Sequence, residues 1–297
     1  MAAFQPFFSP KQVAKALNAS ESSVKRWCDQ GAIETVRTVG GHRKISLDAI
    51  RRFLTNTNRT LSNPQSIGLK VTAEPTANEI PGGRDADQRE FREALASGDE
   101  AKCRRILRDR IERAGGPSSR SADILITDAM HGIGHAWDDN QLDAYQERRG
   151  CEICLRLINE LRAGLPLPSP TAPIAMGGTF SGDPYQIPTA LVDLTLRELG
   201  WNATSLGCEL PVESFLKAAL DYQPTLIWLS VSAYADLEQF IADENRLVDG
   251  LPPETAVIVG GRGIIESALD RLQYSAICSE LSELIDFAHI LVSSKSA

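Results

Sequence analysis

The sequence lacks the features that would place the chain in or across a membrane. None of its apolar runs reaches the roughly 18 residues that a membrane-spanning helix needs. Its first residues, MAAFQPFFSPK, have neither the charged start nor the long apolar core of a signal peptide. We therefore expect a cytoplasmic protein with no membrane partner.

Cysteine pairs that would indicate disulfides or a structural zinc site are also missing. The six cysteines are scattered, at Cys28, Cys103, Cys151, Cys154, Cys208 and Cys278. Cys151 and Cys154 form a single C-x-x-C inside an apolar helical pattern, without the second pair that a zinc site needs. We expect these two thiols to pack in a hydrophobic core.

Motifs of common enzymes are absent as well. The chain has no Walker loop, no G-x-S-x-G and no H-E-x-x-H, and V-G-G-R-G at 259–263 is too short for a dinucleotide fingerprint. His131 and His135 stand four residues apart in a helical pattern, a spacing that suits a metal, but no third ligand follows them. The sequence therefore predicts a protein that is not an enzyme, with no catalytic residues and no metal site.

Charge is distributed unevenly along the chain. Residues 1–60 carry ten Lys and Arg against four Asp and Glu, a net +6, which leaves −14 for the remainder of a chain whose total is −8. A basic head on an acidic body suits a protein whose head alone touches a polyanion such as DNA.

Composition and periodicity divide the chain into four parts. Residues 1–56 are dense in helix signals, and residues 57–87, rich in Asn, Thr, Pro and Gly, predict a flexible linker. Residues 88–165 predict a four-helix bundle. In residues 170–297 strands and helices alternate, which predicts a flavodoxin-like doubly wound parallel sheet. The predicted fold class is thus multidomain α and α/β.

The last part shows four apolar strand patterns, at 173–176, 202–207, 224–233 and 255–263. Helices are expected at 189–199, 212–222, 237–249 and 281–291, and the segment 267–274 completes the domain. Ligands of such sheets bind at the carboxyl ends of the strands. The loops that follow the strands are therefore the expected site.

The basic head begins with two helix starts. S-P-K-Q from Ser9 is a capping-box pattern with Pro at the first helical position. Ser20 caps a second helix that buries Val24 and Trp27 and ends at Gly31. This arrangement predicts a helix-turn-helix whose second helix enters the major groove of DNA.

A hairpin pattern follows the second helix. Two short β-prone runs flank Gly40 and Gly41, which favours a hairpin that lays cations along the DNA backbone. Ser46 is then expected to cap a third helix, whose Ile50, Phe53 and Leu54 close a small core.

Three runs in the head, F-S-P-K-Q-V-A-K-A-L, S-V-K-R-W and R-T-V-G-G-H-R-K-I, resemble the MerR/excisionase-type winged helix-turn-helix. The resemblance implies a recognition helix in the major groove, a wing on the backbone and dimeric binding to an inverted repeat in double-stranded DNA. The alternative is a basic helical hairpin used for protein contacts.

The DNA contacts can be divided by chemistry. Phosphate contacts are expected from Lys11, Arg37, Arg43 and Lys44, with His42 as a donor at the wing tip. Base contacts are expected from Ser22, Ser23, Lys25 and Arg26. A change of Arg43 to Ala should then weaken binding to all DNA sequences alike and lower the salt slope by about one.

The helical part carries a second resemblance. I-G-H-A-W, nine residues and then Glu147 resemble the helical cap of cobalamin-binding regulators of the light-responsive CarH/LitR type. In that family a Trp, nine residues and then Glu-His cover the upper face of adenosylcobalamin. Trp137 and Glu147 match this pattern, whereas Arg148 and Arg149 replace the expected histidine.

The resemblance continues in the last part. L-G-x-x-x-P-x-E at 206–213, Ser230 and Ser232, and Gly260 and Gly261 fall where the family places the loops that bury the nucleotide tail of cobalamin. The glycines would let the backbone approach that ligand closely.

The loop that should supply the cobalt ligand departs from the family pattern. The family has D-x-H-x-x-G after the first strand. In this chain Asp183 matches the Asp of that pattern, Tyr185 replaces its His, and Pro188 replaces its Gly. A neutral phenol with a pKa near 10 is a poor cobalt ligand. The sequence therefore predicts that His-ligated cobalamin binding is lost.

Taken together, these patterns predict a DNA-binding transcriptional repressor with a cobalamin-type sensor and an oligomeric state that controls operator binding. We expect a homodimer or a higher homo-oligomer. One alternative is a regulator that still binds a tetrapyrrole, either cobalamin without His ligation or haem through His131 or His135, as a light or redox sensor. Another is a carrier subunit of a cobalamin-dependent methyltransferase, which would need no DNA-binding head.

Overall fold

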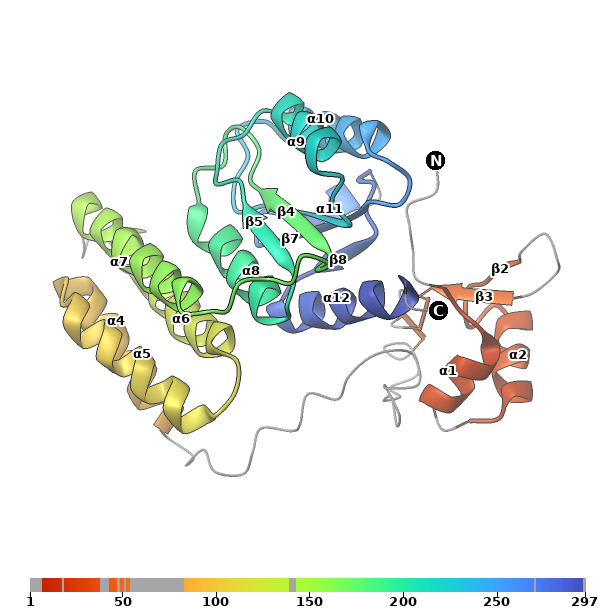
Figure 1. Cartoon of the computed structure of the whole chain (residues 1–297), viewed down its shortest axis with the longest axis horizontal. Coiled ribbons are helices and arrows are strands. Elements are labelled where there is room, and N and C mark those ends of the chain that lie inside the picture. Colours follow the sequence, from red (N-terminus) through yellow and green to blue (C-terminus); the bar gives the residue numbers. More distant parts are fainter. Residues whose placement is uncertain are drawn as a thin grey trace.

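The structure is a computed structural model, and it describes residues 7–17, 19–37, 43–46, 49–50, 52–53, 83–138, 143–269 and 271–295. Figure 1 shows a small head, a layer of helices and a sheet flanked by helices. Within the described ranges, no helix combines the length and apolar content that crossing a membrane requires.

The head opens with the predicted pair of helices, α1 (Pro10–Ala16) and α2 (Glu21–Asp29). The capping box at Ser9 is confirmed, because the backbone N–H of Ser9 donates to Gln12 Oε1 at 2.9 Å and that of Gln12 donates to Ser9 Oγ at 3.3 Å. Ser20 caps α2 by accepting the N–H of Ser23 at 3.1 Å. Hydrogen-bonded caps of this kind satisfy N–H groups that a helix start otherwise leaves open.

Three short antiparallel strands complete the head in the order β1-β3-β2. Strands β2 (Val36–Arg37) and β3 (Arg43–Ser46) pair with Arg37 opposite Arg43, as the predicted hairpin requires, while its turn at Gly40 and Gly41 lies outside the described residues. Strand β1 (Phe7–Phe8) pairs with the other edge of β3. The sequence analysis did not predict β1, because two residues carry no periodicity.

The core of the head forms as expected where the structure describes it. Val13, Val24, Ile45, Ile50 and Phe53 are all buried. Ser46 Oγ accepts the N–H of Ala49 at 3.2 Å, which is the predicted cap. Trp27 is only partly buried, with its ring 4.9 Å from that of Phe53. The predicted core residue Leu54 lies outside the described residues.

Four helices form the helical part: α4 (Gly83–Ser97), α5 (Glu100–Ala114), α6 (Ser118–Asp138) and α7 (Ala144–Ala163). Helix α4 begins inside the segment 57–87 predicted as linker, so that prediction was wrong for residues 83–87. The polar stretch G-R-D-A-D hides the helix start, because its apolar stripe begins only at Phe91.

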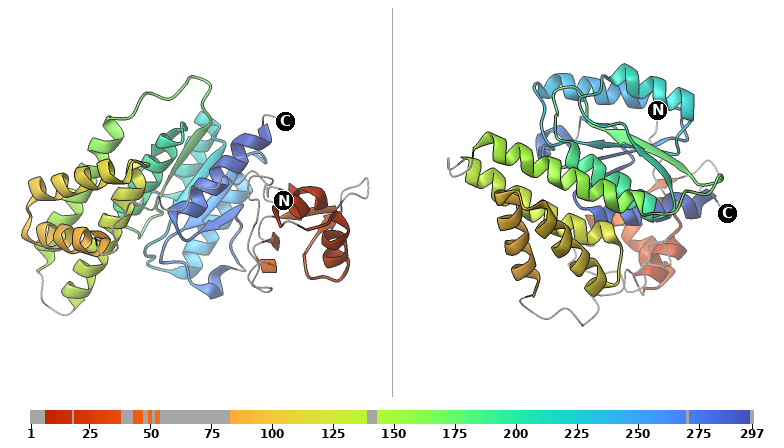
Figure 2. Two further views of the ribbon diagram at one scale, coloured as in Figure 1. Left: turned by 90° about the horizontal axis from the view of Figure 1, so that it is seen from below. Right: turned by 60° about the vertical axis from the view of Figure 1, so that its left-hand side comes forward.

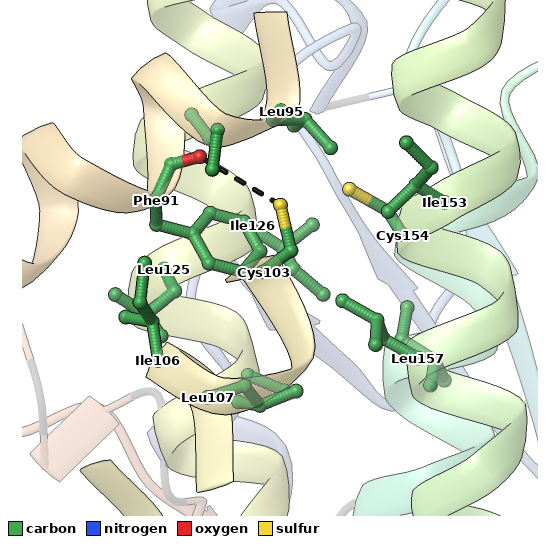
Figure 3. Close-up of a cluster of buried hydrophobic side chains, with 14 of the residues drawn as sticks. Phe91, Leu95, Cys103, Ile106, Leu107, Leu125, Ile126, Ile153, Cys154 and Leu157 are labelled. Atoms are coloured by element: carbon green, nitrogen blue, oxygen red, sulfur yellow. Dashed lines mark hydrogen bonds between the residues drawn. The ribbon is translucent and has the colours of Figure 1, made fainter. Parts of the chain in front are cut away.

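Cysteine side chains help to fill the bundle core (Figure 3). Cys103 and Cys154 are fully buried among Phe91, Leu95 and Leu157, and the Cys103 thiol points at the Phe91 carbonyl oxygen, 3.9 Å away. Burial raises the pKa of Cys103 to about 12. The prediction of a packed thiol is confirmed for Cys154, while Cys151 is only partly buried.

The C-terminal part is a five-stranded sheet in which every strand pair is parallel. Its strands are β4 (Ile174–Gly178), β5 (Asn202–Ser205), β6 (Leu226–Ser230), β7 (Ala256–Gly260) and β8 (Ala276–Cys278). The order β5-β4-β6-β7-β8 is the flavodoxin-like order, which confirms the predicted fold class. The fifth strand, β8, was missed, because three residues are too few to show a strand pattern.

Helices cover both faces of this sheet (Figures 1 and 2). One apolar layer holds side chains of α9 (Val212–Tyr222) and α10 (Leu237–Gly250), and the other holds side chains of α8 (Gln186–Glu198) and α12 (Leu281–Lys295). A short helix, α11 (Glu266–Leu269), precedes β8.

Helix α8 joins the bundle to the sheet. Its Leu191 and Leu194 belong to the bundle core, whereas Leu196 belongs to the core beneath the sheet. An ion pair between Arg162 of α7 and Asp193 of α8 lies at the same junction. The bundle is therefore packed against the α/β domain through α8.

Candidate nucleic-acid interface and sensory site

Helix α2 presents a polar face to solvent. Lys25 and Arg26 are exposed, and the buried Val24 anchors the opposite side of the helix in the head core. Lys25 Nζ pairs with Glu21 Oε1 at 2.7 Å, one turn earlier on the helix. Both side chains are exposed, so this pair is weak and is compatible with the predicted base contact of Lys25.

The two serines predicted to contact bases are engaged at the helix start. The hydroxyls of Ser22 and Ser23 lie 2.8 Å and 2.9 Å from Ser20 Oγ. They thus take part in the cap of α2, and a base contact would have to compete with these hydrogen bonds. Lys11, on α1, is exposed.

Arg43 connects β3, in the predicted wing, to the end of α2. Its Nη2 lies 2.5 Å from Oδ1 of Asp29, the last residue of α2, and its side chain is only 22% exposed. Lys44 is half-buried beside it on β3. The side chain of Arg37 and the whole of His42 lie outside the described residues, so the DNA contacts assigned to the wing stay predictions.

The Arg43–Asp29 pair gives Arg43 a structural role in addition to the phosphate contact that the sequence predicts. We expect Arg43→Ala to weaken binding to all DNA sequences about tenfold and to lower the salt slope by about one. Asp29→Ala removes the same ion pair but keeps the cation, so its salt slope should not fall. Fluorescence anisotropy with operator and random DNA at several salt concentrations measures both effects. A loss confined to the operator would contradict the assignment to phosphate.

At the carboxyl edge of the sheet, Asp183 holds two loops together. Its carboxylate is buried, and Oδ2 accepts the N–H groups of Ser232 at 2.6 Å and Ala233 at 3.2 Å. The other oxygen accepts the N–H of Tyr185 at 3.1 Å. Asp183 thus ties the loop after β4 to the loop after β6.

Tyr185 precedes the first residue of α8, and its side chain is 49% exposed. No imidazole stands in this loop, whose sequence is Asp183-Pro-Tyr-Gln-Ile-Pro188. Pro188 lies inside the first turn of α8, where a missing N–H costs little. At the position where the sequence analysis expects a ligand, the chain therefore presents the phenol of Tyr185.

Packing within the protein explains the two glycines at the end of β7, Gly260 and Gly261. A Cβ on Gly260 would lie 2.3 Å from the Cys278 carbonyl oxygen on β8, and one on Gly261 would lie 2.3 Å from that of Val231. Gly261 also has a φ of +117°, a backbone conformation that residues other than glycine rarely adopt. The predicted close approach of a ligand to these glycines stays a prediction, as does the ligand role of Ser230, which is buried, and of Ser232.

The residues of the predicted helical cap lie on α6 and α7. Glu147 ends the first turn of α7 and Arg148 follows it, with Glu147 Oε2 3.7 Å from Arg148 Nε. The Cys151 thiol donates to Glu147 at 3.6 Å, and burial beside this acid raises the pKa of Cys151 to about 12. Trp137 belongs to the last turn of α6, but its side chain lies outside the described residues. Convergence of these residues on a ligand stays a prediction.

Arg262 is a residue that the sequence analysis passed over. It follows β7 in V-G-G-R-G, and its Nη2 lies 2.8 Å from Nδ1 of His131 on α6. A guanidinium can only donate, so Nδ1 of His131 accepts and carries no proton in this arrangement. The contact links the carboxyl edge of the sheet directly to the bundle. Only the tertiary structure brings these two residues together, since 130 residues separate them.

Among the residues that the structure describes, no three His, Cys, Asp or Glu side chains gather in a way that could hold a metal ion. The side chain of His135, the partner of His131 in the predicted i, i+4 pair, lies outside this set.

Comparisons with known proteins agree with the two-part organisation. Residues 7–58 match the family described as helix-turn-helix domain. The repressor CarH of Myxococcus xanthus, described as an HTH-type transcriptional repressor, is 25% identical over 167 residues, which are 56% of this chain and 52% of CarH. Dimethylamine corrinoid protein 2 of Methanosarcina acetivorans is 23% identical over 141 residues, 46% of this chain and 65% of that protein. The chain thus spans about half to two thirds of these relatives.

Among solved structures, the monomethylamine corrinoid protein of Methanosarcina barkeri is similar, with a TM-score of 0.57 and 16% identity over 70% of this chain and 99% of that one. At this identity the likeness shows the fold. The chain therefore joins an N-terminal helix-turn-helix domain to a module with the fold of a cobalamin-binding protein.

Proposed function

We propose that this protein is a transcriptional repressor that binds double-stranded DNA through α2 and the wing. The observation that carries the proposal is the head itself, a helix-turn-helix domain that presents Lys25 and Arg26 on the open face of its second helix. Its net charge of +6 contrasts with the −14 of the remaining chain, which would confine DNA contact to the head. The alignment with CarH supports repression rather than activation.

The body is proposed to act as the sensor of the regulator. Its bundle and sheet have the fold of a corrinoid protein, and the alignment with CarH extends over more than half of the chain. A sensor of this kind would change the oligomeric state, because two or four heads on one operator bind far more tightly than one through their raised effective concentration. We therefore propose a homodimer or higher homo-oligomer as the DNA-binding form.

The residues at the carboxyl edge do not fit cobalamin held by a histidine. Tyr185 replaces the ligand, both oxygens of Asp183 are occupied by backbone N–H groups, and Arg262 reaches across to His131. We propose that the sensor works without His-ligated cobalamin. Absorption spectra of the purified protein with and without added hydroxocobalamin test this, and a tight complex with a shifted spectrum would refute it.

The fold of a corrinoid protein favours a second candidate, a regulator that binds a tetrapyrrole in another way. Haem bound through Nδ1 of His131 would have to displace Arg262, and otherwise the other ring nitrogen of His131 would have to be the ligand. Titration with haemin, followed by the Soret band, separates this candidate from a sensor that binds no tetrapyrrole. A carrier subunit of a cobalamin-dependent methyltransferase would not need a DNA-binding head. We therefore propose that the protein is a regulator and not part of an enzyme.

Arg26 gives the sharpest test of DNA recognition. Arg26→Ala should lower affinity for the operator about 30-fold, because a base-contacting Arg contributes about 1–3 kcal/mol, while affinity for random DNA changes little. The operator is first found by selection from random duplexes with the full chain. Arg105→Ala, on the exposed face of α5, is the matched control and should change neither affinity. An equal loss of affinity for operator and random DNA would indicate that Arg26 contacts phosphate and not a base.

A further inference from the structure

Helix α12 belongs to the α/β domain along one face. Leu284, Phe287, Ala288 and Leu291 are buried in the core beneath the sheet, together with Trp201 and Trp228. Their spacing of three, four and seven residues is that of a single helical stripe. This stripe anchors α12 to the body of the protein.

A second face of α12 belongs to the head. Ile290 is 4% exposed, and it lies in the same apolar cluster as Phe8, Val13 and Ile50. Within the described part of the chain, every other buried member of that cluster comes from residues 8–53. Ile290 therefore completes the core of the head from a helix near the other end of the chain.

Both faces are apolar over the same short stretch. Of residues 287–291, all but His289 are buried, whereas Val292 is 42% exposed. A helix that is apolar around most of its circumference packs against partners on more than one side. Figures 1 and 2 show α12 running from beneath the sheet to the head.

We infer that α12 is the docking element that holds the DNA-binding head on the sensory body, with Ile290 as its anchor. The head and the body are in one chain, so their contact needs less intrinsic affinity than an encounter between separate molecules. Helix α2 lies on the side of the head away from α12 (Figure 1), so docking leaves the recognition helix open. Docking therefore sets the orientation of α2 relative to the body and does not cover it.

The consequence for regulation rests on the proposed function, whereas the docking itself does not. A movement of α12 against the sheet would turn the head and change the spacing between two heads in an oligomer. Since operator half-sites have a fixed spacing, such a turn would alter DNA affinity. Docking is measured without DNA, so a head that docks but binds no DNA would refute the proposed function alone.

The test compares Ile290→Glu with Val292→Glu in the full chain. Both changes place the same charge on α12, but only Ile290 is buried in the head. Ile290→Glu should raise the radius of gyration in small-angle scattering and increase amide exchange in residues 7–17 about tenfold or more, because an unpaired charge cannot be buried in the apolar core of the head without a large cost. Val292→Glu should match the wild type in both measurements.

Light scattering and circular dichroism complete the experiment. The mass of Ile290→Glu should equal that of the wild type, with unchanged helical content. A radius of gyration and head exchange equal to those of the wild type would overturn the inference. A lower mass for Ile290→Glu than for the wild type would also overturn the inference, because Ile290 would then contact the head of a second copy of the chain.

Discussion

Replacing Asp183 with alanine is expected to lower the free energy of unfolding of the α/β domain by about 4 kcal/mol. The change leaves the N–H groups of Tyr185, Ser232 and Ala233 without their acceptor. These groups are partly buried, and since a fully buried unsatisfied donor costs about 1–3 kcal/mol, three of them in the lower half of that range total about 4 kcal/mol. Urea unfolding followed by tryptophan fluorescence measures the effect, because Trp201 and Trp228 are both buried in this domain.

Asp183→Asn is the matched control. The asparagine keeps the shape and one acceptor oxygen, so we expect it to lose about half as much stability as the alanine variant. A loss below about 0.5 kcal/mol for Asp183→Ala, the range of ordinary surface substitutions, would show that Asp183 does not hold the two loops together. The aspartate would then be free for a role toward a ligand, as the resemblance implies.

The second large effect concerns Glu244, a fully buried residue of α10. Its Oε2 accepts the N–H of Gln273 at 3.0 Å, whereas Oε1 has no hydrogen-bond partner among the residues that the structure describes. Burial raises the pKa of Glu244 to about 7, the nearby Asp249 adds to the rise, and the Gln273 N–H opposes it. The folded domain therefore binds this proton more tightly than the unfolded chain does.

The pH dependence follows from that difference. Because the folded pKa lies above the unfolded value of 4.5, the contribution of Glu244 to stability is complete below pH 4.5 and is lost as pH rises to about 7. At 1.36 kcal/mol per pKa unit, the loss is about 3 kcal/mol. Urea unfolding of the α/β domain at several values from pH 4.5 to 8 measures it.

Glu244→Gln isolates this residue from the other acids. Glutamine keeps the acceptor for Gln273 and carries no charge, so the variant should equal the wild type near pH 4.5 and exceed its stability by about 3 kcal/mol at pH 8. The same decline with pH in both proteins would assign the pH dependence to other groups. Glu213 and Glu238 do not account for a decline above pH 4.5, because the pKa of each is lowered, that of Glu213 by a backbone hydrogen bond and then by Arg246, and that of Glu238 by its hydrogen bond to Arg271.

Most of the head was predictable from the sequence, because its signals are local. Each of these signals depends only on nearby residues in the chain. They are the serine that caps a helix three residues before its N–H donor, the inward-facing valine, and the pair of glycines between two strands. The missed elements, β1 and β8, are two and three residues long and exist only through pairing with β3 and β7. Short strands of this kind have no periodicity of their own.

The residue types at the candidate site could be read from the sequence, whereas their arrangement could not, and their roles toward a ligand stay predictions. The sequence alone determined that Tyr185 stands where the cobalt-ligating His is expected and that the head is basic and the body acidic, because residue type fixes donor chemistry and charge. Only the tertiary structure decided that Asp183 ties two loops, that Arg262 meets His131 and that Ile290 completes the core of the head. These contacts join residues 49, 131 and more than 200 positions apart, and their formation depends on the packing of α8 and α12 against the sheet. Local sequence patterns carry no information about such distances, since the free energy of each contact arises only when the distant elements are already in place.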